Sequence, residues 1–188
     1  MSHKGEAYSA SGAIFLDNPI RRLIQPPSEL IDKLAINPTD VVMDFGCGPG
    51  FFTIDLAKKA KSVVAIDVSL EMLKKVQNKA RKSRTKNIQF LQSDGKSLQL
   101  DNSSVDKILL VTVYHEVGEN ETVLKEFERI LNPHGKLIIV EVIKKSIFPG
   151  APLQNPKVLT SEIEAANFKL EQMQPYKNYG IFFFTKKA

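Results

Sequence analysis

Short apolar runs alternate with amphipathic stretches along most of this chain. The runs Val41–Phe45 and Ser62–Asp67 are almost continuously apolar and rich in β-branched residues, which is typical of strands that are buried on both faces. The stretch after Ser69 repeats its apolar residues at the helical period, at Met72, Leu73, Val76 and Ala80. Two strands are therefore predicted in this region, followed by a helix that Ser69 can cap.

The same alternation continues toward the C-terminus. Further strands are predicted at 87–94, 105–113 and 135–143, and further helices at 51–60 and 119–131. Strands that alternate with helices through short connections form parallel sheets, and the crossovers are right-handed. The pattern predicts an α/β fold with a Rossmann-like, doubly wound sheet and helices on both faces.

The N-terminal segment, 1–27, has no such pattern and ends in two prolines, so the first core helix should begin after it, with Ser28 as the N-cap. This segment is either a lid over a site, with Tyr8 or Phe15 against the ligand, or a strap packed on the edge of the sheet. We expect a single domain over 1–188 whose Rossmann-like core covers 28–188.

The alternation of strands and helices also ends near the C-terminus. A loop with three prolines at 146–156 precedes a short helix that Thr160 or Ser161 would cap. Two final strands meet across 176–178, which predicts an antiparallel hairpin at the end of the sheet.

Composition excludes several classes of protein. Charged residues at 25% and hydrophobic residues at 43% are typical of a globular chain, and every apolar run is far shorter than the ~20 residues that span a bilayer. We expect no signal peptide and no membrane association. The single cysteine, Cys47, excludes an intramolecular disulfide and a multi-cysteine metal site within these residues, so we predict no metal and a reducing, cytoplasmic setting.

The net charge is +5, and much of the excess lies between Lys58 and Lys86. These lysines could form a nucleic-acid face, or they could be the solvated face of surface helices. No aromatic residues are interleaved with them for base stacking, so charge alone indicates no nucleic-acid partner.

The stretch "DFGCGPGFF", from Asp44 to Phe52, follows the first strand. It is either an ordinary tight turn or a backbone cradle for a ligand, since ligands of doubly wound sheets bind beyond the carboxyl ends of the strands. The next two strands also end in acids, Asp67 and Asp94, so three carboxylates should gather at one rim of the sheet. A nucleoside ligand is the better explanation for all three, because an acid after the second strand is placed to bind a ribose diol.

The spacing D-x-G-x-G-x-G differs from the G-x-G-x-x-G fingerprint of dinucleotide enzymes, whose third glycine would fall at Phe51. It resembles motif I of the class I S-adenosylmethionine-dependent methyltransferases, especially the small type 11/25 group related to the ubiquinone-biosynthesis methyltransferases. The resemblance runs from about Val41 onward. "LNPHGKLIIVEV" is similar to the family's "L-x-P-G-G" turn and fifth strand, with His134 in place of the first glycine. It also implies seven strands, of which a C-terminal one is antiparallel.

The resemblance implies the cofactor S-adenosylmethionine, with S-adenosylhomocysteine as product. The glycine loop would hold the methionine part, Asp44 would orient the loop or meet the ammonium group, and Asp67 would accept the ribose hydroxyls. The implied cofactor-binding residues are Asp44, Gly46, Cys47, Gly48, Gly50, Phe51, Asp67, Val68, Met72, Asp94, Gly95 and Val111. Cys47 is expected to be a small packing residue rather than a nucleophile.

The acceptor side would follow the fourth strand. His115 and Glu116 lie just past that strand, where a histidine with an acidic neighbour could act as general base. Alternatively His115 caps the rim or contacts the cofactor's edge while Glu116 is solvated. We predict a small-molecule acceptor. An RNA or protein methyltransferase that uses the basic surface, or a non-catalytic cofactor-binding module, remains the alternative.

Overall fold

The structure is a computed structural model that describes residues 26–117, 119–144 and 153–187. Its strands are β1 (Val41–Phe45), β2 (Ser62–Asp67), β3 (Ile88–Gln92), β4 (Val105–Val111), β5 (Leu131–Val142), β6 (Phe168–Tyr176) and β7 (Tyr179–Lys186). Its helices are α3 (Pro27–Lys33), α4 (Thr53–Ala57), α5 (Leu70–Lys82), the short 3₁₀ helix η1 (Tyr114–Glu116), α6 (Asn120–Ile130) and α7 (Pro156–Ala165). No helix in the described ranges is long and apolar enough to cross a membrane.

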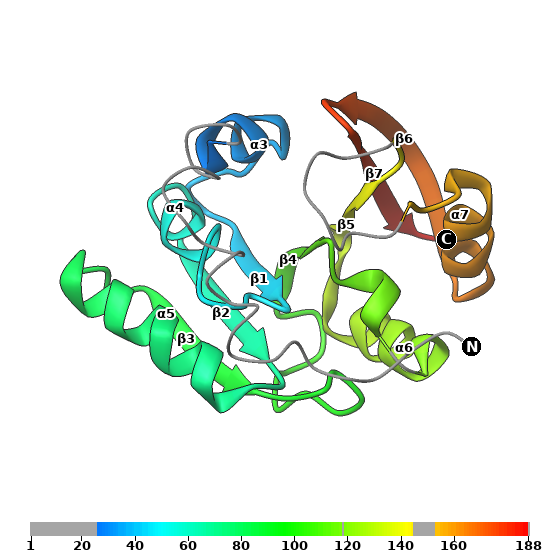
Figure 1. Ribbon diagram of the computed structural model, residues 1–188. Coiled ribbons are helices and arrows are strands. Elements are labelled where there is room, and N and C mark those ends of the chain that lie inside the picture. Colours follow the sequence, from blue (N-terminus) through cyan, green and yellow to red (C-terminus); the bar gives the residue numbers. More distant parts are fainter. Residues whose placement is uncertain (1–25, 118, 145–152, 188) are drawn as a thin grey trace. The chain divides into compact units, whose positions relative to one another are not determined.

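The strands form a seven-stranded sheet in the order β3-β2-β1-β4-β5-β7-β6 (Figure 1). The predicted fold class is confirmed: the sheet is Rossmann-like, mostly parallel, and surrounded by helices. The described residues divide into two compact units, one that ends at Asp94 and one that begins at Gly95. The expectation of a single domain over 1–188 stays a prediction.

In the first unit, β1 pairs in parallel with β2, and β2 with β3. The helix α5 lies between β2 and β3 in the chain, and Ser69 caps it, since the Ser69 side chain accepts a hydrogen bond from the Met72 backbone N–H at 3.4 Å. The predicted inner face of this helix is confirmed, because Met72, Leu73, Val76 and Ala80 are all buried. The parallel pairing brings the carboxyl ends of β1 and β2 to the same edge.

In the second unit, β4 pairs in parallel with β5, which pairs antiparallel with β7, and β6 completes the predicted hairpin. The inward residues predicted for α6 are buried: Val123, Leu124, Phe127, Ile130 and Leu131. The strand β5 begins directly after α6 and carries a bulge, because the partner of Val105 is Leu131 while the partner of Lys107 is Lys136. The turn predicted before residue 135 is therefore this bulge, which lies within β5.

Two predicted helix starts are wrong. The helix α3 begins at Pro27 rather than after Ser28, and α7 begins at Pro156, where the Asn155 side chain accepts from the Lys157 N–H at 3.0 Å. Both prolines occupy the first helical turn, where a missing N–H leaves no bond unmade and the fixed φ favours the helix. Two strands also end earlier than predicted: β3 ends at Gln92 rather than at 94, and β4 ends at Val111 rather than at 113.

The predicted lid or strap falls mostly on residues 1–25, which lie outside the described residues, and so do Tyr8 and Phe15. Most of the predicted proline loop, 146–152, also lies outside them.

Candidate functional site

The glycine turn between β1 and α4 has a defined backbone. Gly46, Gly48 and Gly50 have φ of 70°, 52° and 80°, the left-handed region that suits glycine. The Cys47 N–H donates to the Ile66 carbonyl of β2 at 2.9 Å, and the Gly50 N–H donates to the Cys47 carbonyl at 3.0 Å. The turn is therefore attached to the end of the neighbouring strand.

Two of these glycines have different surroundings. A Cβ built on Gly50 would lie 2.4 Å from Cγ2 of Val76, so the turn packs directly on α5 there. A Cβ built on Gly48 would meet no atom within 4 Å. The backbone at Gly48 thus borders open space that a side chain would occupy, as expected where a ligand approaches the main chain.

Asp67, at the end of β2, connects the turn to the next helix. Its Oδ2 accepts from the Gly48 N–H at 2.8 Å and its Oδ1 accepts from the Ser69 N–H at 2.8 Å. Burial raises the pKa of Asp67, and the two backbone hydrogen bonds oppose that rise. A carboxylate has about four acceptor positions, so each oxygen retains one for a further donor.

Asp44, at the end of β1, is buried, and its Oδ2 accepts from the Thr53 hydroxyl at 2.6 Å. Burial raises the pKa of Asp44 to about 6, the Thr53 hydrogen bond lowers it and the Asp67 charge raises it. This hydrogen bond joins the strand before the glycine turn to the helix after it, which supports the loop-orienting role for Asp44.

Two further residues of the turn pack inward. Cys47 is buried with Ala65, Leu73 and Val76, and burial together with the nearby carboxylates Asp44 and Asp67 raises the pKa of its thiol well above the ordinary range. This supports the packing role for Cys47, because the thiol form is a poor nucleophile. Phe51 is buried against Phe52, with ring centroids 4.9 Å apart at 79°.

The other predicted cofactor residues differ in exposure. Val68, next to Asp67, is 49% exposed, so its apolar side chain is available to a ligand there. Met72 is buried on the inner face of α5. Asp94 is exposed and lies two residues beyond β3, so it is not the last residue of that strand. Gly95 has a φ of 86° and Val111 is buried at the end of β4; both belong to the second unit.

The first unit therefore brings Asp44, the glycine turn and Asp67 together, with Val68 exposed beside them. An open backbone face at Gly48, two free acceptor positions on Asp67 and an exposed apolar side chain fit a nucleoside with a charged amino-acid tail. No cluster of three His, Cys, Asp or Glu that could bind a metal ion occurs in the described part of the chain.

The second unit places a histidine between two carboxylates. His115 Nδ1 lies 3.1 Å from Oε1 and 3.0 Å from Oε2 of Glu141, while Nε2 lies 3.6 Å from Oε1 of Glu116. Burial lowers the pKa of His115, but the hydrogen bond and charge of Glu141 and the charge of Glu116 outweigh it and raise the pKa overall. The expected acidic neighbour Glu116 is present, and the closer one is Glu141.

Sequence reasoning missed Glu141. It is a fully buried acid on β5, and the signal was its position as the one charged residue inside the apolar run "LIIVEVI". A buried carboxylate requires a partner, so this interruption of a strand pointed to a polar contact.

The backbone that leads to His115 is strained. Thr112 has a φ of 54°, which is rare for a β-branched residue. Its N–H donates to the Val140 carbonyl at 2.8 Å and its hydroxyl to the Val111 carbonyl at 2.7 Å, which hold this conformation. Such strain occurs often at functional sites.

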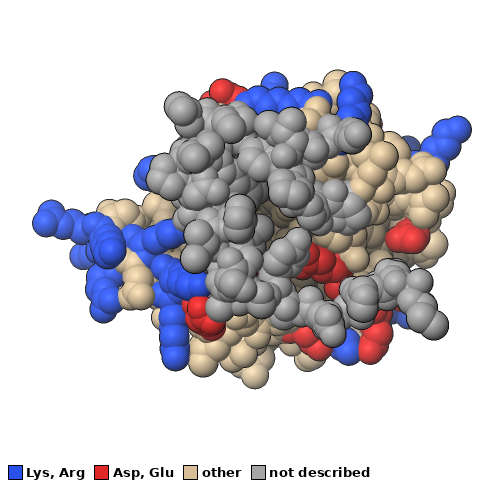
Figure 2. Space-filling model, in the orientation of Figure 1, with Lys and Arg blue, Asp and Glu red and all other residues tan. Residues whose placement is uncertain are grey.

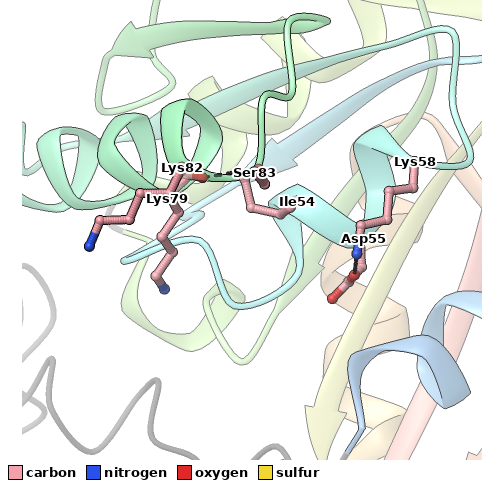
Figure 3. Close-up of a pocket in the computed structure, with 6 residues that line it drawn as sticks. All are labelled: Ile54, Asp55, Lys58, Lys79, Lys82 and Ser83. Carbon is pink, nitrogen blue, oxygen red and sulfur yellow. Dashed lines mark hydrogen bonds and ion pairs between the residues drawn. The ribbon is translucent and has the colours of Figure 1, made fainter.

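A hollow of about 380 Å³ lies between α4 and the end of α5 (Figure 3). It is lined by Ile54, Asp55, Lys58, Lys79, Lys82 and Ser83. Lys58 pairs with Asp55 at 2.6 Å, and Lys79 donates to the Pro49 carbonyl of the glycine turn at 2.5 Å. From Lys58 to Lys86 the chain has ten lysines and arginines against two acids, and Figure 2 shows Lys and Arg side chains gathered where Figure 1 draws α5.

Comparison with known proteins gives a consistent result. Residues 36–178 match the family described as "Methyltransferase domain". A crystal structure of a SAM-dependent methyltransferase from Aquifex aeolicus superposes with a TM-score of 0.86 at 25% identity, covering 97% of this chain and 100% of that one.

Two curated relatives differ in what they act on. A 23S rRNA (uracil(1939)-C(5))-methyltransferase from Haemophilus influenzae is 37% identical over 115 residues, which are 55% of this chain and 26% of the relative. A probable cobalt-precorrin-6B C(15)-methyltransferase from Methanococcus vannielii is 25% identical over 150 residues, 80% of this chain and 74% of the relative. The chain thus spans about a quarter of the first relative and about three quarters of the second.

Proposed function

This chain belongs to the methyltransferase-domain family, and from that premise we propose that it transfers the methyl group of S-adenosylmethionine to a small molecule. The observation that carries the proposal is the hydrogen bond from the Gly48 N–H to Asp67. It joins the glycine turn to the strand-end acid, so that both parts of a nucleoside site are held in one arrangement.

Four parts of the first unit then have roles in binding. The backbone at Gly48 approaches the amino-acid end of the cofactor, and the two free acceptor positions of Asp67 receive the ribose hydroxyls. Val68 packs against the adenine, and Asp44 holds the turn through Thr53. The bound cofactor supplies an activated methyl group on a sulfonium, so the chain's own work is mainly to orient the reactants and exclude water.

In the second unit, we assign His115 as the general base, with Glu116 as an acidic neighbour. A base is needed where the acceptor must lose a proton. We assign Gly95, Val111 and Asp94 to the cofactor as well, from the resemblance alone.

The proposal of a small-molecule acceptor is supported by the share of each relative's length that this chain matches. The chain covers about three quarters of the relative named for cobalt-precorrin-6B but only about a quarter of the rRNA enzyme. We also propose a cytoplasmic setting, which the single cysteine supports. Fractionation of cells that express the protein tests that setting.

Calorimetry tests cofactor binding. We expect S-adenosylmethionine to bind and NAD to give no detectable heat. Asp67→Ala should weaken binding by about 2–4 kcal/mol, because two hydrogen bonds to a charged acceptor and the anchor of Gly48 are lost. Asp101→Ala, an exposed acid outside the predicted site, is the control. Binding of NAD instead, or unchanged affinity in Asp67→Ala, would contradict the assignment.

Transfer of labelled methyl groups into a cell extract, divided into small-molecule, RNA and protein fractions, tests the acceptor. We expect the label in the small-molecule fraction.

The second candidate is an RNA acceptor, favoured by the similarity to the rRNA enzyme and by the lysines around the hollow. In that case the label enters RNA, and the double variant Lys58→Glu, Lys82→Glu abolishes that transfer while leaving cofactor affinity unchanged.

A further inference from the structure

Glu141 receives no role in the function proposed above, although it contacts the residue assigned as the base. It is fully buried on β5, and both of its oxygens lie within 3.1 Å of His115 Nδ1. An ionised carboxylate only accepts hydrogen bonds, so Nδ1 must carry the hydrogen that Glu141 receives. The neutral ring then has its lone pair on Nε2.

The Nδ1 side of the ring is taken by Glu141, and Nε2 has no hydrogen bond to any residue that the structure describes. The His115 side chain is 14% exposed, whereas Glu141 is fully buried. On that side Glu116 Oε1 is 3.6 Å from Nε2, beyond hydrogen-bond distance, and the Glu116 side chain is 35% exposed. Nε2 is therefore the ring nitrogen left to accept a proton.

We infer that Glu141 is a positioning residue that holds His115 in the Nδ1–H tautomer, so that Nε2 takes a proton from the methyl acceptor. The inference rests on the proposed function and narrows its substrate class to acceptors that lose a proton from oxygen or nitrogen on methylation. Thioethers and tertiary amines, which need no base, are outside this class.

The acceptor's oxygen or nitrogen forms a bond to the methyl carbon, and its proton passes to Nε2. The electron pair of the broken carbon–sulfur bond stays on sulfur. The imidazolium that results is stabilised by Glu141 on Nδ1 and by Glu116 near Nε2, and it later releases its proton to water.

The strained backbone at Thr112 supports a functional role. Thr112 and His115 follow the same strand, and the Thr112 N–H is bound to Val140, the residue next to Glu141. The position of the histidine relative to the carboxylate is thus set by β4 and β5 together.

Among the described residues, the charged groups within ion-pair distance of His115 are Glu141 and Glu116. Both raise the pKa of His115 against the effect of burial. The neutral, basic form therefore predominates only at a pH above this raised value, and turnover should rise with pH through it. Removal of the Glu141 charge should move that rise to lower pH.

Nitrogen NMR tests the interaction of His115 with Glu141 and needs no methyl acceptor. The chain has three histidines, His3, His115 and His134, and His115→Asn identifies the signals of His115. We expect the neutral ring of the unaltered protein to be the Nδ1–H tautomer. Glu141→Gln should lower the pKa of His115 by about 1–3 pH units, since an opposite charge in contact is lost.

Glu116→Gln is the matched control and should lower the pKa of His115 by less, because its carboxylate is more distant and more exposed. The Nε2–H tautomer in the unaltered protein, or an unchanged pKa in Glu141→Gln, would overturn the inference. If Glu141→Gln does not fold, the tautomer of the unaltered protein decides the question by itself.

Turnover of the acceptor found in the extract gives the second readout. His115→Asn should reduce turnover by about 10²–10⁴-fold with unchanged affinity for S-adenosylmethionine. Glu141→Gln should reduce maximal turnover and shift the acid side of its pH profile downward. A purely structural role would leave that profile unchanged, and a methyl group found on a thioether or tertiary amine would refute the substrate class. Absence of any methyl transfer would instead contradict the proposed function. The NMR result on the tautomer would still decide whether Glu141 positions His115.

Discussion

Gly48 and Gly50 both have positive φ, but their surroundings separate two functions of one turn. Gly50 lies against Val76, so its missing side chain allows the turn to pack on α5. Gly48 borders open space and donates its N–H to Asp67. Gly50 serves packing, whereas Gly48 is the position where we propose that the ligand approaches the backbone.

Alanine at each position should therefore give a different result. Gly48→Ala should lower stability by about 1–2 kcal/mol through its backbone conformation, and lower affinity for S-adenosylmethionine at least tenfold because the new methyl group occupies the ligand's space. Gly50→Ala should add about 1–3 kcal/mol of overpacking to the same backbone penalty. Urea denaturation and calorimetry measure both quantities, and equal stability losses in the two variants would contradict this distinction.

Asp44 makes stability depend on pH. Its pKa rises from 3.8 to about 6 on folding, so ionised Asp44 destabilises the folded state, and this loss develops as pH rises from about 4 through 6. Two pH units correspond to about 3 kcal/mol. The Thr53 hydrogen bond keeps the loss from being larger.

Asp44→Asn should accordingly stabilise the protein at pH 8 by about 1–3 kcal/mol and have almost no effect at pH 4, because the amide never ionises but still accepts from Thr53. Urea denaturation at the two pH values measures the difference. The same change in unfolding free energy at both pH values would show that Asp44 does not titrate in this range.

At the scale of elements, α5 supports the glycine turn as well as the sheet. Val76 packs under Gly50 and Lys79 donates to the Pro49 carbonyl. The apolar stripe of α5 was predicted from its period, but the contact with the turn was not, because it joins residues about thirty positions apart.

A double-mutant cycle measures this contact. Val76→Ala alone should destabilise the protein through a cavity, yet it should also remove the shortest contact of a methyl group at position 50, the one to Cγ2 at 2.4 Å, while the contact to Cβ at 2.8 Å remains. Gly50→Ala should therefore cost about 1–2 kcal/mol less when Val76→Ala is present. Additive effects on the unfolding free energy would show that the two residues do not share this space.

Other elements show which local signals were reliable. The bounds of β1 and β2 were predicted to the residue, since buried parallel strands have sharply defined apolar runs. The starts of α3 and α7 were not, because Ser28, Thr160 and Ser161 are good capping types but a proline nearby occupies the first turn instead. Local propensity identifies the residues that could begin a helix, and competition between neighbouring residues decides which of them does.

At the scale of the whole molecule, the residues predicted for cofactor binding belong mostly to the first unit and the predicted base to the second. A ligand that binds the folded protein should stabilise it by mass action. S-adenosylmethionine at a hundred times its dissociation constant should add about 2.7 kcal/mol, or about 5–10 °C in Tm for a chain of this size.

Thermal unfolding with and without S-adenosylmethionine measures this shift. Asp67→Ala should show at most about a third of this shift at the same concentration, because its affinity is lower by about 2–4 kcal/mol, whereas His115→Asn should shift like the unaltered protein. A reduced shift in His115→Asn would show that His115 contacts the cofactor, the alternative considered from the sequence.

The sequence by itself determined the fold class, the glycine turn and the acids at 44 and 67, because buried strands, helical periods and left-handed glycines are encoded over a few residues. The tertiary structure decided which groups meet across distant strands. Gly48 bonds to Asp67 only because β1 and β2 pair in parallel. His115 bonds to Glu141 only because β4 and β5 pair in parallel. A lone acid in an apolar strand indicates that some partner exists, but only pairing between strands determines which one.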